Sequence, residues 1–198
     1  MKLLSAVLIT VVFILSCSRG EQETDRPTIL TGQNIFAELK ERTVKDPNDA
    51  EAWYSLADMY ERSEMFREEI DALKKVVAIQ PKRGYAYVRL GNAYNRVGQH
   101  EDAVKSYVTA LKYQPKNPLI YNNLAVSYGK IGKKNEEIAA LEKAIALRPR
   151  YATARYNLGV ALLKKGNRQG ALKQYQELKK FDEGTASSLK KEIDAKRS

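Results

Sequence analysis

The stretch YVRLGNAY, residues 87–94, decides the fold, because related stretches stand one period of 34 residues before it and after it. They read WYSLADMY at 53–60, YNNLAVSY at 121–128 and, less closely, RYNLGVAL at 155–162. Self-similarity at a fixed period of this length is the signature of stacked structural repeats. Prolines and glycines keep the same period: Pro47, Pro81, Pro115 and Pro149, then Gly98, Gly132 and Gly166.

Each repeat has the pattern of two amphipathic helices, because apolar residues recur every three or four positions in both halves. The periodic glycines are expected to end the first helix, where a left-handed conformation is easiest for glycine. The periodic prolines are expected to follow the second helix and stop it. One such pair cannot bury its apolar stripe alone, whereas a stack of pairs can. The sequence therefore predicts an all-α solenoid.

These units resemble the tetratricopeptide repeat family, whose signature has an aromatic residue, Leu-Gly and a tyrosine in the first helix. The second helices carry Ala103 with Tyr107 and Ala171 with Tyr175, again as in the family. The resemblance covers about residues 34–183. It implies an α-solenoid of about four helix-turn-helix repeats, at 50–83, 84–117, 118–151 and 152–183.

Three positions depart from the family pattern. Glu69 and Glu137 stand where alanine is usual, and Ile70 and Ile138, which follow them, are expected to take over the packing. Unit four lacks the first aromatic residue and has Arg155 instead.

Both ends of the stack are expected to be capped. Residues 34–49 read as half a repeat, with Ile35 and Leu39 where second helices carry apolar residues. Residues 184–198 keep only Leu189 and Ile193 as large apolar residues, which fits a C-terminal capping helix with one narrow buried stripe.

The N-terminal region carries an apolar run, LLSAVLITVVFIL at residues 3–15, preceded by Lys2. This run is too short for a helix that spans a bilayer core of about 30 Å, but its length suits a secretory signal. The sequence Ile14-Leu15-Ser16-Cys17 resembles a bacterial lipobox. The resemblance implies a lipoprotein signal peptide at 1–16, acylation of Cys17, and a flexible tether over 17–33.

Three other interpretations of this region stay open: cleavage after Ser18, an uncleaved anchor, or a cysteine at position 17 that is incidental. Lipidation would place the protein in the bacterial cell envelope, anchored to a membrane through Cys17. Because Ser18 rather than aspartate follows the cysteine, the resemblance favours the outer membrane, facing the periplasm.

In this family the first helices line a concave face, and the inward-facing positions carry over residue by residue. Asparagine amides both donate and accept hydrogen bonds, so they suit an extended peptide backbone, and basic residues suit carboxylates. The expected ligand is an extended or helical segment with acidic character. A purely structural role stays open for the basic positions, because cations in the last turn of a helix complement its dipole. The predicted groove residues are Arg62, Arg89, Asn92, Asn95, Arg96, Asn122, Asn123, Lys130, Asn157 and Lys164.

Composition narrows the function classes. The formal net charge of +10 favours acidic partners or anionic surfaces, but no block of five or six consecutive basic residues indicates nucleic-acid binding. Cys17 and His100 are each the single residue of their type, so a metal site of Cys and His ligands is not expected. The sequence contains no phosphate loop, HExxH or nucleophile elbow, and we expect no enzyme, no cofactor and a surface position for His100.

The sequence therefore predicts a membrane-anchored, non-catalytic scaffold or assembly factor that binds another protein in its concave groove. Two alternatives stay open. The protein could bind anionic glycan or lipid headgroups through its basic surface, or it could be a soluble co-chaperone-like repeat module. The sequence leaves the partner and the oligomeric state open.

Overall fold

The computed structural model describes residues 32–195, so the predicted signal peptide, Cys17 and most of the predicted tether lie outside the described residues. The described part is all α-helical, which confirms the predicted fold class. No helix within residues 32–195 is long and apolar enough to cross a membrane. The helices are α1 (Gly32–Lys45), α2 (Ala50–Arg62), α3 (Phe66–Ile79), α4 (Gly84–Arg96), α5 (His100–Tyr113), α6 (Pro118–Lys130), α7 (Lys134–Leu147), α8 (Ala152–Lys164), α9 (Arg168–Lys179) and α10 (Glu183–Ala195).

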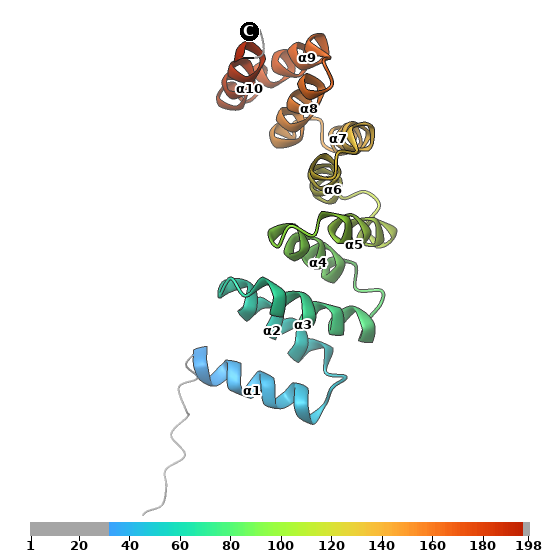
Figure 1. Ribbon diagram of the computed structural model, residues 1–198, viewed down its shortest axis with the longest axis vertical. Coiled ribbons are helices and arrows are strands. Elements are labelled where there is room, and N and C mark those ends of the chain that lie inside the picture. The colour runs from blue at the N-terminus through green and yellow to red at the C-terminus, as the bar shows by residue number, and fades with distance from the viewer. Residues whose placement is uncertain (1–31, 196–198) are drawn as a thin grey trace, which may run out of the picture.

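The helices pair as the period predicts. The pairs α2–α3, α4–α5, α6–α7 and α8–α9 form units one to four, and they follow one another along the long axis from α1 to α10 (Figure 1). Each pair packs against the next, so the apolar core runs as a series of clusters through the stack. This arrangement is a solenoid in which each unit contacts mainly its neighbours.

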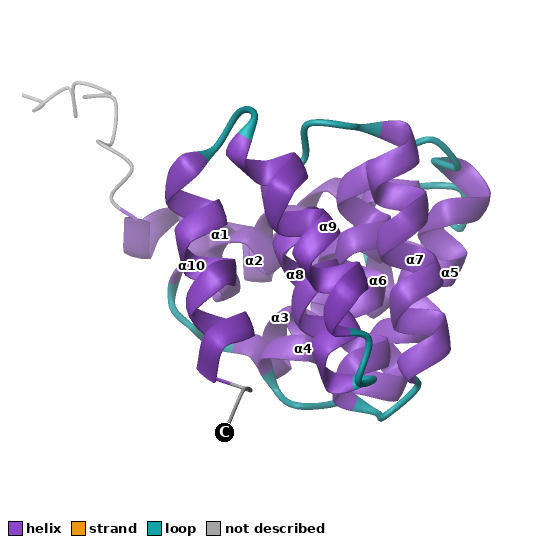
Figure 2. Cartoon of the chain, turned by 90° about the horizontal axis from the view of Figure 1, so that it is seen from above, coloured by secondary structure: helices purple, strands orange, loops and turns teal. Residues whose placement is uncertain are grey.

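The first helices lie closer together than the second helices. Helix α6 contacts α4 on one side and α8 on the other, whereas no comparable contact joins α3 to α5, α5 to α7 or α7 to α9 within the described residues. Helices that touch across unit boundaries form the inner side of a curved stack. In the view from above, α5 and α7 lie at one edge of the molecule, with α4 and α6 inward of them (Figure 2). The concave face is therefore built from the first helices, as expected.

The turn inside each unit is the same in all four. Gly98, Gly132 and Gly166 have φ angles of 78°, 77° and 83°, the left-handed region that glycine adopts without strain. In unit two the Gln99 backbone N–H donates to the Tyr94 carbonyl at 2.9 Å, which caps the end of α4. This is the hydrogen bond of a Schellman motif. The periodic prolines each lie two residues beyond a helix end: Pro47 after α1, Pro81 after α3, Pro115 after α5 and Pro149 after α7.

Unit four keeps the first-helix contact without its aromatic residue. In unit one the Trp53 indole Nε1 donates to the Pro47 carbonyl at 3.0 Å. In unit four the Arg155 Nε donates to the equivalent Pro149 carbonyl at 2.8 Å. Arginine thus replaces tryptophan because both present an N–H donor at the end of a long side chain.

Both ends of the stack are covered. At the N-terminal end, α1 buries Leu39 against unit one, while Ile35 stays partly exposed. At the C-terminal end, α10 packs on α8 and α9 and buries the narrow stripe of Ala186, Leu189 and Ile193 completely. These helices shield the apolar faces that the terminal units would otherwise present to water.

Unit one has a strained residue in its turn, because Glu64 occupies the position of the three turn glycines with a φ of 56°. A non-glycine residue in this region costs about 1–2 kcal/mol. We therefore expect Glu64→Gly to raise the free energy of unfolding by about 1 kcal/mol and the melting temperature by about 2–4 °C. Thermal unfolding followed by circular dichroism measures the change.

The control for this variant is Gly98→Ala, which places a Cβ in the same conformation and should lower the melting temperature by a similar amount. A decrease in stability for Glu64→Gly would show that the left-handed turn carries no strain.

Candidate partner-binding groove

The groove is the inward-facing surface of α2, α4, α6 and α8, and all ten predicted groove residues lie on these four helices. The structure divides them into four groups with different surroundings. Arginines of units one and two pair with carboxylates, four asparagines of units two to four bond to each other, Asn95 bonds to Ser127 and His100, and two lysines of units three and four border a cavity.

Arg89 is held inside the groove wall by carboxylates of unit one. Its side chain is 15% exposed, and its Nη2 lies 3.0 Å from Glu61 Oε2 and 3.4 Å from Glu69 Oε1. The guanidinium also stacks over the Tyr54 ring, 4.8 Å from its centroid. Arg89 is therefore committed to joining α4 to α2 and α3, and it is not a free ligand for a partner.

The other two arginines among the predicted groove residues are also paired. Arg96 Nη1 lies 2.8 Å from Glu61 Oε1, and Arg62 Nη2 lies 2.8 Å from Asp58 Oδ2. Both side chains are exposed, so these pairs contribute little to stability. Their effect is on the surface potential, because the positive charge of the groove is neutralised in units one and two.

Glu69 is the buried centre of this arrangement. Burial, followed by the charge of Glu61, raises the pKa of its carboxyl, and the charges of Arg89 and Arg96 oppose that rise. Its Oε2 and the Arg89 Nε are buried with no hydrogen-bond partner within residues 32–195. Ile70 is buried here, as expected, and the Glu69 side chain is buried as well.

Four asparagines form a continuous hydrogen-bonded chain across three first helices, which we name the asparagine ladder. Asn157 Nδ2 donates to Asn122 Oδ1 at 3.0 Å, Asn122 Nδ2 to Asn123 Oδ1 at 3.3 Å, and Asn123 Nδ2 to Asn92 Oδ1 at 3.2 Å. The Tyr107 hydroxyl closes the chain by donating to Asn92 Oδ1 at 2.6 Å. Burial raises the pKa of Tyr107 to about 12, so this hydroxyl remains a donor at neutral pH.

The asparagine ladder ties α8 to α6 and α6 to α4, which fixes the spacing of the first helices at the groove. Its two ends retain unused capacity. Asn92 Nδ2 and Asn157 Oδ1 form no hydrogen bond with any residue of the described range. The asparagines therefore serve the structure first, and these end groups are the two that form no hydrogen bond within the described residues.

Asn95 faces inward to a different site. Its Nδ2 donates to Ser127 Oγ at 2.9 Å, and its Oδ1 lies 3.0 Å from the Nδ1 of His100. His100 is half-buried at the start of α5, beside an amide rather than a carboxylate or a reactive hydroxyl. Asn95 thus joins α4 to α5 and α6.

Lys130 and Lys164 border the groove in units three and four, and both are exposed. Neither forms an ion pair with any residue between 32 and 195. They flank a cavity of about 200 Å³ whose wall includes Asn157 and the carboxylate of Glu137. Burial raises the pKa of Glu137, and the charges of Lys164 and then Lys134 oppose that rise. In the C-terminal half of the groove the two lysines therefore have no ion-pair partner among the described residues, although the charge of Lys164 acts on Glu137.

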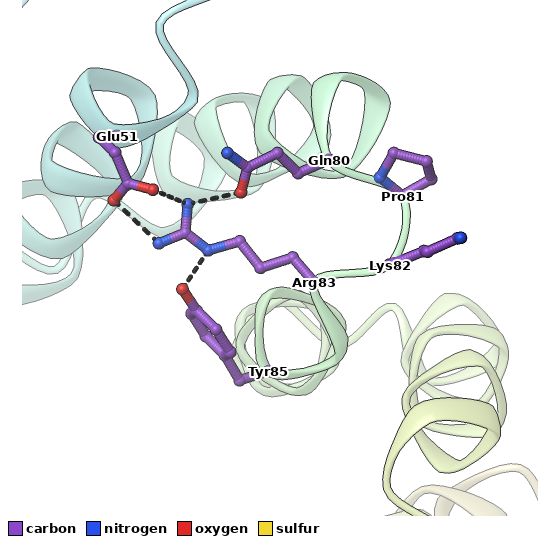
Figure 3. A pocket seen from close by; sticks show the side chains of 6 residues that line it. All are labelled: Glu51, Gln80, Pro81, Lys82, Arg83 and Tyr85. Atoms are coloured by element: carbon purple, nitrogen blue, oxygen red, sulfur yellow. Dashed lines mark hydrogen bonds and ion pairs between the residues drawn. The ribbon is translucent and has the colours of Figure 1, made fainter.

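Arg83 is a residue that the sequence did not single out. It lies at the junction of units one and two, and its guanidinium donates to Glu51 at 2.6 and 3.0 Å, to Gln80 at 3.0 Å and to the Tyr85 hydroxyl (Figure 3). It also stacks over the Tyr54 ring, 4.4 Å from its centroid. The adjoining cavity of about 550 Å³ thus has its charged group already satisfied within the chain. Nothing periodic signals this role, because Asn117 and Tyr151 stand at the equivalent positions.

The groove carries none of the constellations of a metal centre. Within residues 32–195, no three His, Cys, Asp or Glu side chains gather where they could hold a metal ion. The groups that it offers are amides, ammonium groups, one half-hidden carboxylate and apolar surface at Leu119 and Val126. These groups suit non-covalent recognition of a polypeptide segment.

Comparison with known families identifies the class of protein. Family models described as TPR repeat match residues 91–132 and 133–166, and models described as tetratricopeptide repeat match 50–83 and 153–182. Together these matches cover residues 50–182 except 84–90. The chain therefore belongs to the tetratricopeptide repeat family, and the resemblance in its sequence is confirmed.

Solved structures with the same architecture include several repeat proteins. A crystal structure of MamA shares 23% identity and a TM-score of 0.70 over 82% of this chain and 92% of that chain. MamA from Desulfovibrio magneticus RS-1 shares 20% identity and a TM-score of 0.70, with 74% and 83% covered. YrrB shares 18% identity and a TM-score of 0.64, with 80% and 85% covered. At such identities the likeness shows the fold alone. Comparison with curated proteins gives no match.

The asparagine ladder makes a testable contribution to stability. Asn123→Ala removes its bonds to Asn92 and Asn122 and leaves partly buried amides unpaired. We expect the free energy of unfolding to fall by about 1–3 kcal/mol, because unsatisfied buried polar groups are costly. Urea unfolding followed by circular dichroism measures this loss.

Asn135→Ala is the matched control, because Asn135 is an exposed asparagine that accepts one bond, from Lys165. This change should stay within about 0.5 kcal/mol of the unmodified protein. Equal effects of the two substitutions would mean that the asparagine ladder does not hold the units together.

Proposed function

We propose that this tetratricopeptide repeat protein is a non-catalytic scaffold or assembly factor of the bacterial cell envelope. It binds a segment of a partner protein in the groove of units two to four and is anchored to a membrane through a lipid on Cys17. The observation that carries the groove assignment is the uneven charge: carboxylates neutralise Arg62, Arg89 and Arg96, whereas Lys130 and Lys164 have no such partner among the described residues.

A partner segment of acidic character fits this surface. The two lysines supply ammonium donors for its carboxylates, and the exposed Val126, which lines the same cavity, supplies apolar contact. The amide ends of the asparagine ladder supply donors and acceptors for its backbone. The structurally similar YrrB is described as having an unusual peptide-binding site, which supports a peptide ligand by analogy of fold alone.

The envelope location rests on the sequence. The apolar run at 3–15 and the lipobox-like residues that end at Cys17 are the features that support it. Cys17 is followed by Ser18, which favours the outer membrane facing the periplasm. The same N-terminal features distinguish this proposal from a soluble co-chaperone-like module.

Site-specific photo-crosslinking tests the groove. A photoreactive residue at Val126 in the groove is compared with one at Val108 on α5, because the two valines are 40% and 41% exposed. We expect a defined partner protein to be captured from Val126 and not from Val108. The double variant Lys130→Ala, Lys164→Ala should reduce that capture by at least about tenfold, as loss of two charge-assisted contacts predicts.

Salt separates this proposal from the glycan or lipid-headgroup alternative. Binding through the lysines alone should collapse at high ionic strength, whereas a segment that also makes apolar and backbone contacts should remain partly bound. Equal capture from both valines would contradict the groove assignment.

Metabolic labelling with a palmitate analogue tests the anchor. The wild-type protein should carry the label and fractionate with membranes, and Cys17→Ser should lose the label because the acceptor sulfur is gone. A protein that is unlabelled and soluble in both forms would support the co-chaperone-like alternative instead.

A further inference from the structure

Units one and three each have a buried glutamate where the repeat pattern has alanine, and within the described residues only the glutamate of unit one forms an ion pair. Glu137 stands two repeat periods after Glu69, in the second helix of its unit. Glu69 is met by Arg89, which comes from the first helix of the following unit. The residue equivalent to Arg89 in the unit after Glu137 is Asn157. Asparagine is shorter than arginine and carries no charge, so Glu137 has no equivalent cation.

The carboxylate of Glu137 is hidden but not enclosed. The residue is 9% exposed, and it lines the cavity of about 200 Å³ between α6, α7 and α8. A Cβ on Gly129 would lie 2.6 Å from Glu137 Oε1, so the carboxylate occupies the space that a side chain at 129 would fill. No cation within residues 32–195 lies at ion-pair distance from it.

A buried carboxylate without a cation is costly, and the chain shows that the repeat does not need one here. Units two and four have Ala103 and Ala171 at the equivalent positions, and both alanines are fully buried. Units two and four carry Asn95 and Leu163 where unit three has Gly129, so the glutamate fills the volume that a side chain at 129 would take and adds a charge to it. Its burial at the edge of an open cavity on the groove is the arrangement of a binding group.

We infer that the cavity beside Glu137 receives an arginine side chain of the bound partner segment, and that acidic residues flank this arginine in the partner. The inference rests on the proposed groove function and names the residue that the groove selects. The incoming guanidinium takes the place relative to Glu137 that Arg89 takes relative to Glu69 within the chain.

The surroundings of the cavity explain both parts of this motif. A guanidinium presents several donors in one plane, so it can bind the Glu137 carboxylate and the free Oδ1 of Asn157 together. Lys130 and Lys164 at the rim repel a segment that is basic throughout, and acidic residues on either side of the arginine would pair with them. The groove thus selects a partner segment in which one positively charged side chain lies between negatively charged ones.

Two synthetic peptides test this selectivity. Both are fluorescein-labelled and carry glutamates on either side of one central residue, which is arginine in one peptide and its neutral isostere citrulline in the other. Fluorescence anisotropy with the full chain gives the two dissociation constants. We expect the arginine peptide to bind about tenfold more tightly than the citrulline peptide, as one desolvated charge pair predicts.

The variants Glu137→Gln and Glu136→Gln assign that difference to one carboxylate. Both remove the same charge from α7, but Glu136 is exposed and lies outside the cavity. Glu137→Gln should abolish the preference for arginine, and Glu136→Gln should retain it. Equal affinity of the wild-type chain for the two peptides, or a preference that survives Glu137→Gln, overturns the inference.

The outcomes separate this inference from the proposed function. If both peptides bind equally and the double variant Lys130→Ala, Lys164→Ala weakens the binding of both, the groove function is supported and the arginine site beside Glu137 is wrong. If neither peptide binds while a photoreactive residue at Val126 still captures a partner, only the arginine site is wrong. If neither peptide binds and the residue at Val126 captures nothing, the arginine site and the groove function are both wrong.

A variant of the chain itself tests the pocket without any peptide. Asn157→Arg places an arginine at the position that Arg89 occupies two repeats earlier. The control is Asn157→Leu, which loses the same hydrogen bond to Asn122. We expect the arginine variant to have a higher melting temperature than the leucine variant. The gain should disappear in the Glu137→Gln background. A gain that is independent of Glu137 would show that this cavity does not select a guanidinium.

Discussion

The burial of one apolar stripe per helix pair is the constraint on which the rest of this structure depends. A single pair of helices of 12 to 14 residues is too thin to shield its own apolar side, so each unit is stable only against its neighbours. The same requirement explains the two capping helices, since a stack must end in a face that tolerates water. It also creates the groove. The first helices touch across unit boundaries and, within the described residues, the second helices make no comparable contact, so the stack is curved with the first helices on its inner side.

Polar contacts then decide what each part of that groove can do. Towards the N-terminus, Arg83 and Arg89 insert between aromatic rings and carboxylates and leave little charge for a partner. In the middle, the asparagine ladder uses most of its amide groups to hold the first helices at a fixed spacing. Towards the C-terminus, two lysines and the hidden carboxylate of Glu137 face a cavity that no residue of the described chain fills. The same repeat pattern thus gives a groove whose charges are paired at its N-terminal end and which has an unfilled cavity at its C-terminal end.

The sequence predicted which helices carry the candidate groove residues, and it predicted the surroundings of these residues only in part. The family register placed all ten predicted groove residues on the four first helices, where the structure has them. The basic groove residues, however, combine paired arginines with lysines that have no ion-pair partner among the described residues, and their residue types do not reveal that difference. Glu69 and Glu137 were visible as departures from alanine, but the sequence suggested that neighbouring isoleucines take over the packing. In the structure the two glutamates are themselves buried. Arg83 left no periodic signal at all.

The sequence by itself determined the period, the pairing of the helices, the approximate number of units and the caps. These depend on short-range effects: apolar spacing, a glycine that tolerates a left-handed turn, and a proline that ends a helix. Only the tertiary structure decided which charges pair, which amides are hydrogen-bonded and which buried carboxylate has no ion-pair partner among the described residues. Those outcomes depend on side chains that lie a whole repeat or more apart and meet only when the units stack. Glu69 and Arg89 meet in this way, and Glu137 and Asn157 line one cavity without such a pair.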